Sequence, residues 1–573
     1  MKKNLFLLVY YFLILGYSAG QTPSWLWAKR IGGTSSDGVW AFALDNSGNV
    51  YVTGAFYLTV DFDPGPGVFN LTSAGYYDMF ILKLDSAGNF IWAKRIGGYG
   101  DTFGTAIAMD ASNNIYLTGN FRGGTTDFDP DTGTYNLTPF GYDDTFICKL
   151  DSAGNFIWAK QIGGTLSHDY GWSIAIDALD NVYVDGNFWG TVDFDPGPGT
   201  FSLTSSNYGS FFLSKLNNLG DLIWAKAVGD TGGAYSKSIV LDSIGNIYCS
   251  GDFQGTVDFD PDTGIFNLTS TGLHDVFASK FDSSGNFVWA KELAGAEEQY
   301  ASSITLSHTG NAEIIIIGNF GGTVDFDTGP GIFNLTSAGG MDIFISKFSN
   351  SGNLIWAKSV GGNSLDGRYS SVVLDQIDNV YITGDFRHTA DFDPGAGQFN
   401  LTADSVDLFV SKLDSAGNFL WAKSAGGSSE DVGQCITITN TGYVYLTGGF
   451  LSPLLIIGND SLVNANNSLN IPDIYIAKLD TALTTGNTLL NLINNLSSIS
   501  PNPFTTTATI SFGRQVSGAT FSLYNLLGEK VAETSGINAE RFEFSRAGLG
   551  SGVYVYEVRE KVKSICRGKA VVY

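Results

Sequence analysis

The residues best suited to chemistry are pairs of aspartates that flank a phenylalanine and recur along the chain. The pairs are Asp61 with Asp63, Asp127 with Asp129, Asp193 with Asp195, Asp258 with Asp260, Asp325 with Asp327, and Asp391 with Asp393. In an extended chain, residues i and i+2 face the same side, so each pair would present two carboxylates together. Hard oxygen ligands beside a Gly-rich turn suit calcium, which makes these twelve residues candidate metal ligands.

The same segments also fit a structural role that needs no metal. The ligand order of an EF-hand is not met, because its bidentate glutamate is missing. Aspartate is typical of hairpin turns, in which it caps the backbone, and the Pro-Gly that often follows forms the bend. The turn and the calcium site are both open interpretations of these residues.

Other reactive side chains form no pattern typical of catalysis. The histidines are His168, His274, His308 and His388, and they share neither a metal spacing nor a Ser-His-Asp arrangement. The four cysteines are far apart, so no disulfide framework is predicted. Cys148 and Cys249 lie in strand-like runs where sibling repeats carry small or apolar residues, so we expect both to be buried. We therefore predict no catalytic residue and no cofactor other than calcium.

These residues are set in a long internal repeat. The triplet Trp-Ala-Lys begins at Trp27, Trp92, Trp158, Trp224, Trp289, Trp356 and Trp421, at intervals of 65 to 67 residues. Each repeat holds four strand-like runs, exemplified by residues 173–177, 181–188, 342–348 and 89–96. Alternation, β-branched and aromatic residues, and bounding Gly/Asn/Asp/Ser turns all favour strands. The seven tryptophans are predicted to be packing residues.

A repeat of four short strands predicts a β-propeller blade, with a β-helix or other solenoid as the alternative. The chain ends favour the closed ring. A fourth strand stands alone at residues 25–31, and a third strand stands alone at residues 473–479 with no Trp-Ala-Lys after it. Pairing these two would complete the last blade and remove both open sheet edges. We expect an all-β chain, with residues 21–480 forming a seven-bladed propeller closed by its N-terminal strand.

The unit that contains Asp177, Asn181-Val182-Tyr183-Val184 and the Trp-Ala-Lys strand resembles the SBBP repeat, a bacterial β-propeller repeat. The likeness covers roughly residues 24–480 and recurs seven times. The resemblance implies a fold and no particular activity.

The pattern stops after Asp480. Residues 481–500 have the composition of a linker, and residues 501–573 alternate as a small antiparallel β-sandwich does. Pro501-Asn502-Pro503-Phe504, Gly528-Glu529-Lys530-Val531, the Gly-Val-Tyr strand and the final Gly-Lys strand occur in the order found in the type A C-terminal sorting domain of type IX secretion. This resemblance implies that the type IX machinery is a partner of residues 501–573. It also implies that the protein is secreted or held on the outer surface of a Gram-negative bacterium.

The N-terminus and the charge limit the possible partners. Lys2 and Lys3, an apolar run from Leu5 to Leu15 and Ser18-Ala19-Gly20 predict a signal peptide over residues 1–20. No later segment is long and apolar enough to predict a membrane span. A net charge of −25 disfavours nucleic acid and anionic membrane as partners.

The repeats are better suited to binding than to catalysis. A propeller presents loops on two faces, and near-identical repeats make a broad surface but supply little of the asymmetry that catalysis needs. We therefore expect a non-enzymatic binding scaffold for a glycan or protein ligand. The alternative is a secreted enzyme whose catalytic site lies on the propeller axis, with each blade contributing one residue.

Overall fold

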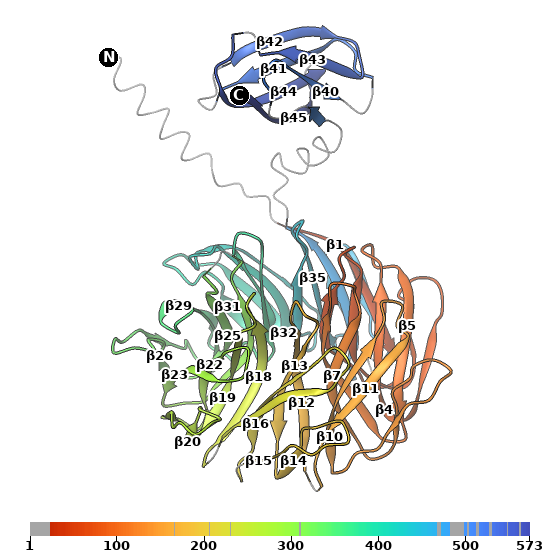
Figure 1. Cartoon of the computed structure of the whole chain (residues 1–573), viewed down its shortest axis with the longest axis vertical. Helices are drawn as coiled ribbons and strands as arrows, with labels where there is room; N and C mark the ends of the chain where they lie inside the picture. The colour runs from red at the N-terminus through yellow and green to blue at the C-terminus, as the bar shows by residue number, and fades with distance from the viewer. Residues whose placement is uncertain are drawn as a thin grey trace. The chain divides into compact units, whose positions relative to one another are not determined.

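The computed structural model describes residues 23–572 apart from 166, 206, 230, 309–310, 467–470, 482–497, 501–503, 512–514, 526–529, 547 and 561–562. The predicted signal peptide, most of the predicted linker, Pro501–Pro503 and Gly528–Glu529 lie outside the described residues. The chain divides into two compact units, one formed by Ser24–Asp480 and the other beginning at Thr481. All the regular elements described in them are strands (Figure 1).

The strands of Ser24–Asp480 pair into sets of four antiparallel strands, one set for each sequence repeat, and short extra pairings join some neighbouring sets into larger sheets. Each set of four is called a sheet below. We number the sheets 1 to 7 in chain order and give their strands from first to fourth. Within the described residues they are β2 (Asp37–Leu44), β3 (Val50–Asp61), β4 (Asn70–Leu84) and β5 (Phe90–Gly98); β6 (Asp101–Met109), β7 (Ile115–Arg122), β10 (Asp143–Leu150) and β11 (Phe156–Ile162); β12 (Asp169–Ile176), β13 (Val182–Phe188), β16 (Ser210–Leu216) and β17 (Leu222–Val228); β18 (Gly233–Leu241), β19 (Ile247–Gln254), β22 (Asp275–Phe281) and β23 (Phe287–Gly295); β24 (Gln299–Leu306), β25 (Ile314–Phe320), β28 (Asp342–Phe348) and β29 (Leu354–Gly362); β30 (Ser370–Leu374), β31 (Val380–Asp391), β32 (Asn400–Leu413) and β33 (Phe419–Ala425); and β34 (Cys435–Ile438), β35 (Tyr443–Phe450), β38 (Asp473–Asp480) and β1 (Ser24–Gly33).

Sheet 7 joins the two ends of this unit. The N-terminal strand β1 pairs antiparallel with β38, in a register that runs from Ser24↔Asp480 to Ile31↔Ile474. The Arg30 side chain donates to Asp473 Oδ2 across the same junction at 2.5 Å. Figure 1 shows β1 and the late strand β35 beside the red and orange strands that follow β1 in the chain.

Short two-stranded hairpins extend the connections between second and third strands, which the sequence did not predict. They are formed by β8 (Thr126–Asp127) and β9 (Asn136–Leu137), β14 (Thr191–Asp193) and β15 (Ser202–Thr204), β20 (Thr256–Asp258) and β21 (Asn267–Thr269), β26 (Thr323–Asp325) and β27 (Asn334–Thr336), and β36 (Leu454–Ile457) and β37 (Asp460–Val463). The end of β5 pairs with β8 of the next sheet through Gly97↔Asp127. Hairpins placed in this way cover part of the open edge of a fourth strand.

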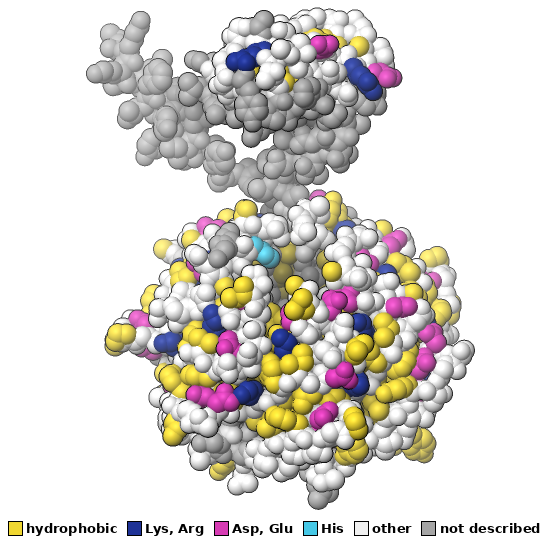
Figure 2. Space-filling view, viewed as in Figure 1, with side chains coloured by type: hydrophobic (Ala, Val, Ile, Leu, Met, Phe, Trp, Pro, Cys, Tyr) yellow, Lys and Arg dark blue, Asp and Glu magenta, His cyan; other side chains and the backbone are white. Residues whose placement is uncertain are grey.

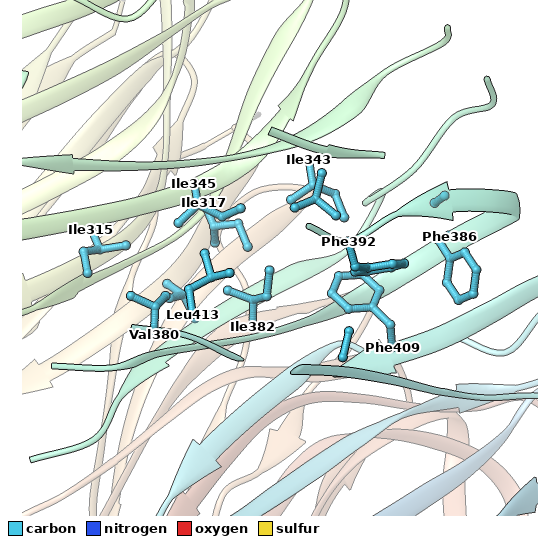
Figure 3. Packing of buried hydrophobic residues seen from close by; sticks show 14 of the residues in the cluster. Ile315, Ile317, Ile343, Ile345, Val380, Ile382, Phe386, Phe392, Phe409 and Leu413 are labelled. Carbon is cyan, nitrogen blue, oxygen red and sulfur yellow. The ribbon is translucent and has the colours of Figure 1, made fainter. Parts of the chain in front are cut away.

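The core lies between neighbouring sheets. Figure 3 shows one interface, where Ile315 and Ile317 of β25 and Ile343 and Ile345 of β28 pack against Val380, Ile382, Phe386, Phe392, Phe409 and Leu413 of sheet 6. Every residue of β25 is buried, because both faces of a middle strand are covered. Cys148 and Cys249 are fully buried in equivalent interfaces, as predicted.

The repeat tryptophans pack between sheets, as the sequence predicts. Gly154, in the turn before β11, has a φ of +84°, and a Cβ there would lie 3.1 Å from the Trp92 ring of the preceding sheet. Lys83 Nζ donates to the Ser152 carbonyl in the same turn at 3.4 Å. The recurring Gly of Asp-Ser-Ala-Gly-Asn therefore provides both the left-handed turn and room for the neighbour's tryptophan.

The second unit consists of two small antiparallel sheets. One contains β39 (Ser498–Ser500), β40 (Thr507–Ser511) and β43 (Arg541–Ser545), and the other contains β42 (Lys530–Ile537), β41 (Ala519–Tyr524), β44 (Gly552–Glu560) and β45 (Lys563–Val572). Phe504, Ile510, Phe521, Phe544 and Tyr556 share one core that draws on both sheets. Among the residues that the structure describes, no helix has the length and hydrophobicity needed to span a membrane.

Candidate functional site

The Asp-Phe-Asp segments form hydrogen-bonded turns. Asp61 Oδ1 accepts the backbone N–H groups of Asp63 at 3.1 Å and Phe69 at 2.8 Å, and Asp63 Oδ1 accepts that of Gly65 at 2.8 Å. Phe62 between them is fully buried. The same bonds are made by the five other pairs, which are Asp127 and Asp129, Asp193 and Asp195, Asp258 and Asp260, Asp325 and Asp327, and Asp391 and Asp393. Each pair therefore stabilises its own bend, as the turn interpretation requires.

The structure adds local detail to the geometry expected for these pairs. The strand ends at the first aspartate of each pair, so the second lies just beyond it. The second aspartates lead into the bend, and they are Asp63, Asp129, Asp195, Asp260, Asp327 and Asp393. The cause is local, because each of these side chains accepts the N–H group two residues further on, as Asp195 does from Gly197 at 2.8 Å.

Each aspartate pair supplies only part of the ligand set that calcium needs. In the described part of the chain, no three His, Cys, Asp or Glu side chains come together so that they could hold a metal ion. This applies to all twelve candidate ligands: Asp61, Asp63, Asp127, Asp129, Asp193, Asp195, Asp258, Asp260, Asp325, Asp327, Asp391 and Asp393. Calcium takes six to eight oxygen ligands, so most would have to be backbone carbonyls and water.

Calcium binding stays a prediction, with a consequence that thermal unfolding can measure. Bound calcium should raise the unfolding midpoint more than magnesium does at the same ionic strength. Asp61→Asn and Asp63→Asn should reduce that difference. Equal shifts with the two ions would mean that they only screen an acidic surface, and the aspartates would then keep only their role in the turn.

A row of aromatic side chains crosses four neighbouring sheets, and the sequence did not predict it. In each antiparallel sheet, the first and third strands begin at the same edge at which the second strand ends. Residues at this edge of one sheet therefore lie next to the corresponding residues of the following sheet. Seven of them form what we call the aromatic row: Tyr142, His168, Tyr170, Trp189, Tyr235, His274 and Tyr300. Successive ring centroids along the row are 4.9 to 6.2 Å apart.

The rings of the row are partly open to solvent. Tyr142 is 57% exposed, the His168 side chain is half exposed, and Tyr170, Trp189 and Tyr235 are of intermediate burial. Trp172, at a bulge in β12, packs against Tyr170 and carries the Lys237 ammonium over its ring at 5.0 Å. Such half-buried rings offer apolar faces to a ligand while their other side is held by the fold.

Buried carboxylates hold the polar ends of these rings in place. His168 Nδ1 donates to Asp143 Oδ2 at 2.6 Å, and the Tyr170 hydroxyl donates to the same oxygen at 3.3 Å. Burial is the largest cause, and the nearby Asp143 carboxylate the second, of a pKa of Tyr170 that is raised to about 12. The Tyr170 hydroxyl therefore stays protonated at neutral pH and keeps its role as a donor.

A second histidine–aspartate contact lies in sheet 4. His274 Nδ1 donates to Asp252 Oδ2 at 3.0 Å, and this bond raises the pKa of His274. The Tyr235 hydroxyl donates to the Tyr208 carbonyl at 2.6 Å. Two of the histidines that form no motif in the sequence are thus placed by aspartates from other strands.

The row continues at both ends. Arg122 binds Asp101 at 2.8 Å and lies over the Phe103 ring, which contacts Trp40 and Tyr77 in sheet 1. Beyond Tyr300 is a pocket of about 470 Å³, lined by Leu273, Met341 and Leu365 and by the carboxylates Glu297 and Glu298. Figure 2 shows that hydrophobic, acidic and basic side chains are interspersed on the visible face of the Ser24–Asp480 unit.

Beside the row, sheet 4 contains a pair of carboxyl groups. Glu292 stands opposite Phe277 in the strand ladder, the position that Arg95 occupies opposite Phe80 in sheet 1. Arg95 donates to buried Asp78 at 2.6 Å, whereas the carboxyl group of Glu292 lies within hydrogen-bonding reach of fully buried Asp275. Burial and the Asp275 carboxyl raise the pKa of Glu292 to about 8.

This pair predicts a loss of stability as pH rises. Between the ordinary glutamate pKa of 4.5 and the folded value of about 8, the folded protein keeps a proton that the unfolded chain releases, so the free energy of unfolding falls with pH. Glu292→Gln should flatten this dependence. Glu292→Arg, which copies sheet 1, should raise the melting temperature more at pH 8 than at pH 5. Identical pH profiles for the wild type and Glu292→Gln would show that Glu292 is not the group that causes the pH dependence.

The row could have been suspected from one sequence signal. One repeat position is aromatic in four successive sheets, as Phe103, Tyr170, Tyr235 and Tyr300, while the Trp189 position varies and is Gln254 in sheet 4. An aromatic residue that recurs at the edge of a sheet, beside positions that vary between repeats, is that signal.

The fold defines the class of protein: an all-β chain built of propeller-like repeats. Comparison with protein families then identifies the repeats and the tail. Residues 91–120 and 157–190 match the β-propeller repeat family, and residues 498–572 match the family described as the secretion system C-terminal sorting domain. This chain is therefore a β-propeller repeat protein that carries a type IX sorting domain, which indicates export to the cell surface or beyond it.

Similar curated proteins are distant and much longer. The uncharacterized WD repeat-containing protein L264 of Acanthamoeba polyphaga mimivirus is 24% identical over 503 residues, which cover 74% of this chain and 36% of that protein. Regulatory protein FlaEY of Caulobacter vibrioides is 23% identical over 303 residues, covering 48% of this chain and 29% of that protein. The chain thus spans about a third of the length of these relatives.

Among solved structures, PorZ is described as an essential bacterial surface component of the type IX secretion system of Porphyromonas gingivalis. It is 12% identical and aligns over 93% of this chain and 86% of its own, with a TM-score of 0.22. A likeness of this size has no bearing on the function of the present chain.

Proposed function

We propose that Ser24–Asp480 is a closed seven-bladed β-propeller that acts outside the cell as a non-enzymatic binding scaffold, with the aromatic row as its binding surface. The row carries this proposal, because its partly exposed rings are supplied by four sheets and are held by buried aspartates. A surface organised in this way before any ligand arrives loses little side-chain entropy on binding.

Closure of the ring is supported by the contacts between sheets 7 and 1. A Cβ on Gly88 of sheet 1 would lie 3.2 Å from the Trp27 ring of sheet 7, and Lys478 Nζ donates to the Ser86 carbonyl at 2.8 Å. These repeat the contacts that Trp92 and Lys83 make with the next sheet. The first and last sheets thus meet as internal neighbours do.

Three alanine substitutions test closure. Gly88, Gly154 and Gly48 have φ values of +80°, +84° and +77°, so each change carries a similar backbone cost of about 1–2 kcal/mol. At Gly88 and Gly154 the methyl also meets a tryptophan, whereas at Gly48 the nearest atom is 3.8 Å away. In a closed ring, Gly88→Ala and Gly154→Ala should lower the free energy of unfolding equally, and both by about 1–3 kcal/mol more than Gly48→Ala. A Gly88→Ala variant as stable as Gly48→Ala would argue for an open ring.

The binding role is tested with a mixed panel of oligosaccharides and peptides. Residues 24–480 and a Tyr170→Ala/Tyr235→Ala variant would be compared by surface plasmon resonance, after matched melting curves show that both are folded. We expect at least one probe to bind the wild type and to lose affinity for the variant. If no probe in either class distinguishes the two proteins, the row is not the binding surface.

An enzyme is the alternative, and the Asp275–Glu292 pair is the observation that supports it. A carboxyl group with a raised pKa, such as Glu292, can act as a general acid near neutral pH, and a second carboxyl group beside it is the usual partner in acid–base catalysis. Asp275 is completely buried, however, which makes it poorly placed to touch a substrate. Hydrolysis of any bound probe by the wild type, abolished by Glu292→Gln, would favour the enzyme.

A further inference from the structure

We infer that the ligand of the aromatic row is an uncharged carbohydrate chain; this inference rests on the proposed binding role of the row. Its basis is the alternation of two kinds of group along one track. Aromatic faces follow one another from Tyr142 to Tyr300, and fixed hydrogen-bonding groups lie between them.

The rings match the apolar part of a sugar. The C–H groups on one face of a pyranose ring form a flat apolar patch of about the size of an aromatic ring, and the two stack without needing a deep cavity. Tyr170, Trp189 and Tyr235 offer rings that are neither fully buried nor freely mobile. A chain of several sugars could contact more than one of them, so weak single contacts would add up.

The polar groups match the hydroxyls of a sugar. The His168 side chain is half exposed beside buried Asp143, and the Arg122 side chain, 3.7 Å from Asp143, is 47% exposed, so both can donate to a ligand. Glu298 beside Tyr300 and Glu297 in the adjoining pocket supply acceptors. Donors and acceptors set side by side suit hydroxyl groups, each of which both donates and accepts.

The negative charge of the protein favours a neutral carbohydrate over an anionic one. The whole chain carries a net charge of −25, and the pocket at the end of the row is lined by Glu297 and Glu298. A polyanionic glycan would be repelled by this surface, and the repulsion would grow at low salt. A neutral chain has no such cost, because its affinity comes from stacking and hydroxyl bonds.

The test is isothermal titration calorimetry of residues 24–480 with cellohexaose, xylohexaose, mannohexaose and chitohexaose. Heparin and polygalacturonate serve as anionic probes. We expect at least one neutral hexamer to bind, with affinity at least tenfold lower for Tyr170→Ala and for Tyr235→Ala. Tyr99→Ala is the matched control, since Tyr99 is 80% exposed and lies outside the row. Tyr235→Phe, which keeps the ring, should bind within about threefold of the wild type.

The outcomes separate this inference from the function on which it rests. Row-dependent binding of a peptide with no binding of any neutral glycan would overturn the carbohydrate inference and leave the binding role standing. Stronger binding of heparin than of the neutral hexamers would overturn it as well. Neutral glycans that bind the wild type and both row variants equally would show that the site lies elsewhere. Binding of no probe of either class would count against both proposals.

Discussion

Deletion of residues 24–33 should abolish cooperative unfolding of the propeller unit and make it aggregate. The deletion removes β1, so Ile474, Ile476 and Leu479 of β38, all buried in the intact protein, lose their covering strand. Burial of one such side chain is worth about 1.5–3 kcal/mol, and a whole domain is stable by about 5–15 kcal/mol. The loss therefore approaches the total stability. Scanning calorimetry and light scattering of the purified unit would measure both effects.

A truncation at the other end provides the control. A chain that ends at Asp480 keeps β1 and β38 paired and loses only the second compact unit. Its unfolding midpoint should match that of the same unit within the full chain to within about 2 °C. A β1-deleted protein with a sharp transition at the wild-type temperature would refute the role of β1 in holding sheet 7 together.

Removal of residues 498–573 should leave a folded propeller inside the cell envelope and almost none outside. These residues match the sorting domain and form their own core, separate from the repeat sheets. Export should therefore fall by far more than tenfold while the melting temperature hardly changes. Immunoblots of culture medium, cell surface and periplasm, with tagged full-length and truncated chains, would measure the distribution.

The converse experiment separates a loss of sorting from a loss of folding. Fusing residues 481–573 to an unrelated secreted β-protein should carry that protein to the cell surface or the medium. A substitution in the core of the tail, Phe521→Ala, should abolish this in both contexts, because Phe521 packs against Phe542, Phe544 and Tyr556. Normal release of the truncated propeller would show that another segment directs export.

Most of the fold was predictable because it is repeated. The third strand predicted over 342–348 coincides with β28, and the run predicted over 181–188 differs from β13 by one residue. The lone strand runs at residues 25–31 and 473–479 pair as expected. Because the pattern occurs seven times, a strand that one repeat predicts weakly is also predicted by the corresponding residues of the other repeats.

The site was less predictable than the fold, because the row combines one repeated aromatic position with residues that only single repeats carry. His168 and His274 become partners of Asp143 and Asp252. His168 directly precedes β12 of sheet 3, whereas Asp143 belongs to β10 of sheet 2. The end of the strand at Asp61 was not predicted either. β3 ends at Asp61, and the chain turns there because the Asp61 side chain accepts backbone N–H groups beyond it.

The pairing of β1 with β38 also sets the order in which this protein can fold. Arg30 and Asp473 are 443 residues apart, so β1, apart from its end at Gly32–Gly33 that pairs with β3, has no partner until almost the whole repeat region exists. Contacts of such high sequence separation are slow to form. A chain that emerges from its N-terminus can assemble its middle sheets early, but sheet 7 cannot be completed before Asp480 has been delivered. Until then most of β1 is an unpaired strand. During this interval the chain is most prone to pair with another copy of itself and to aggregate.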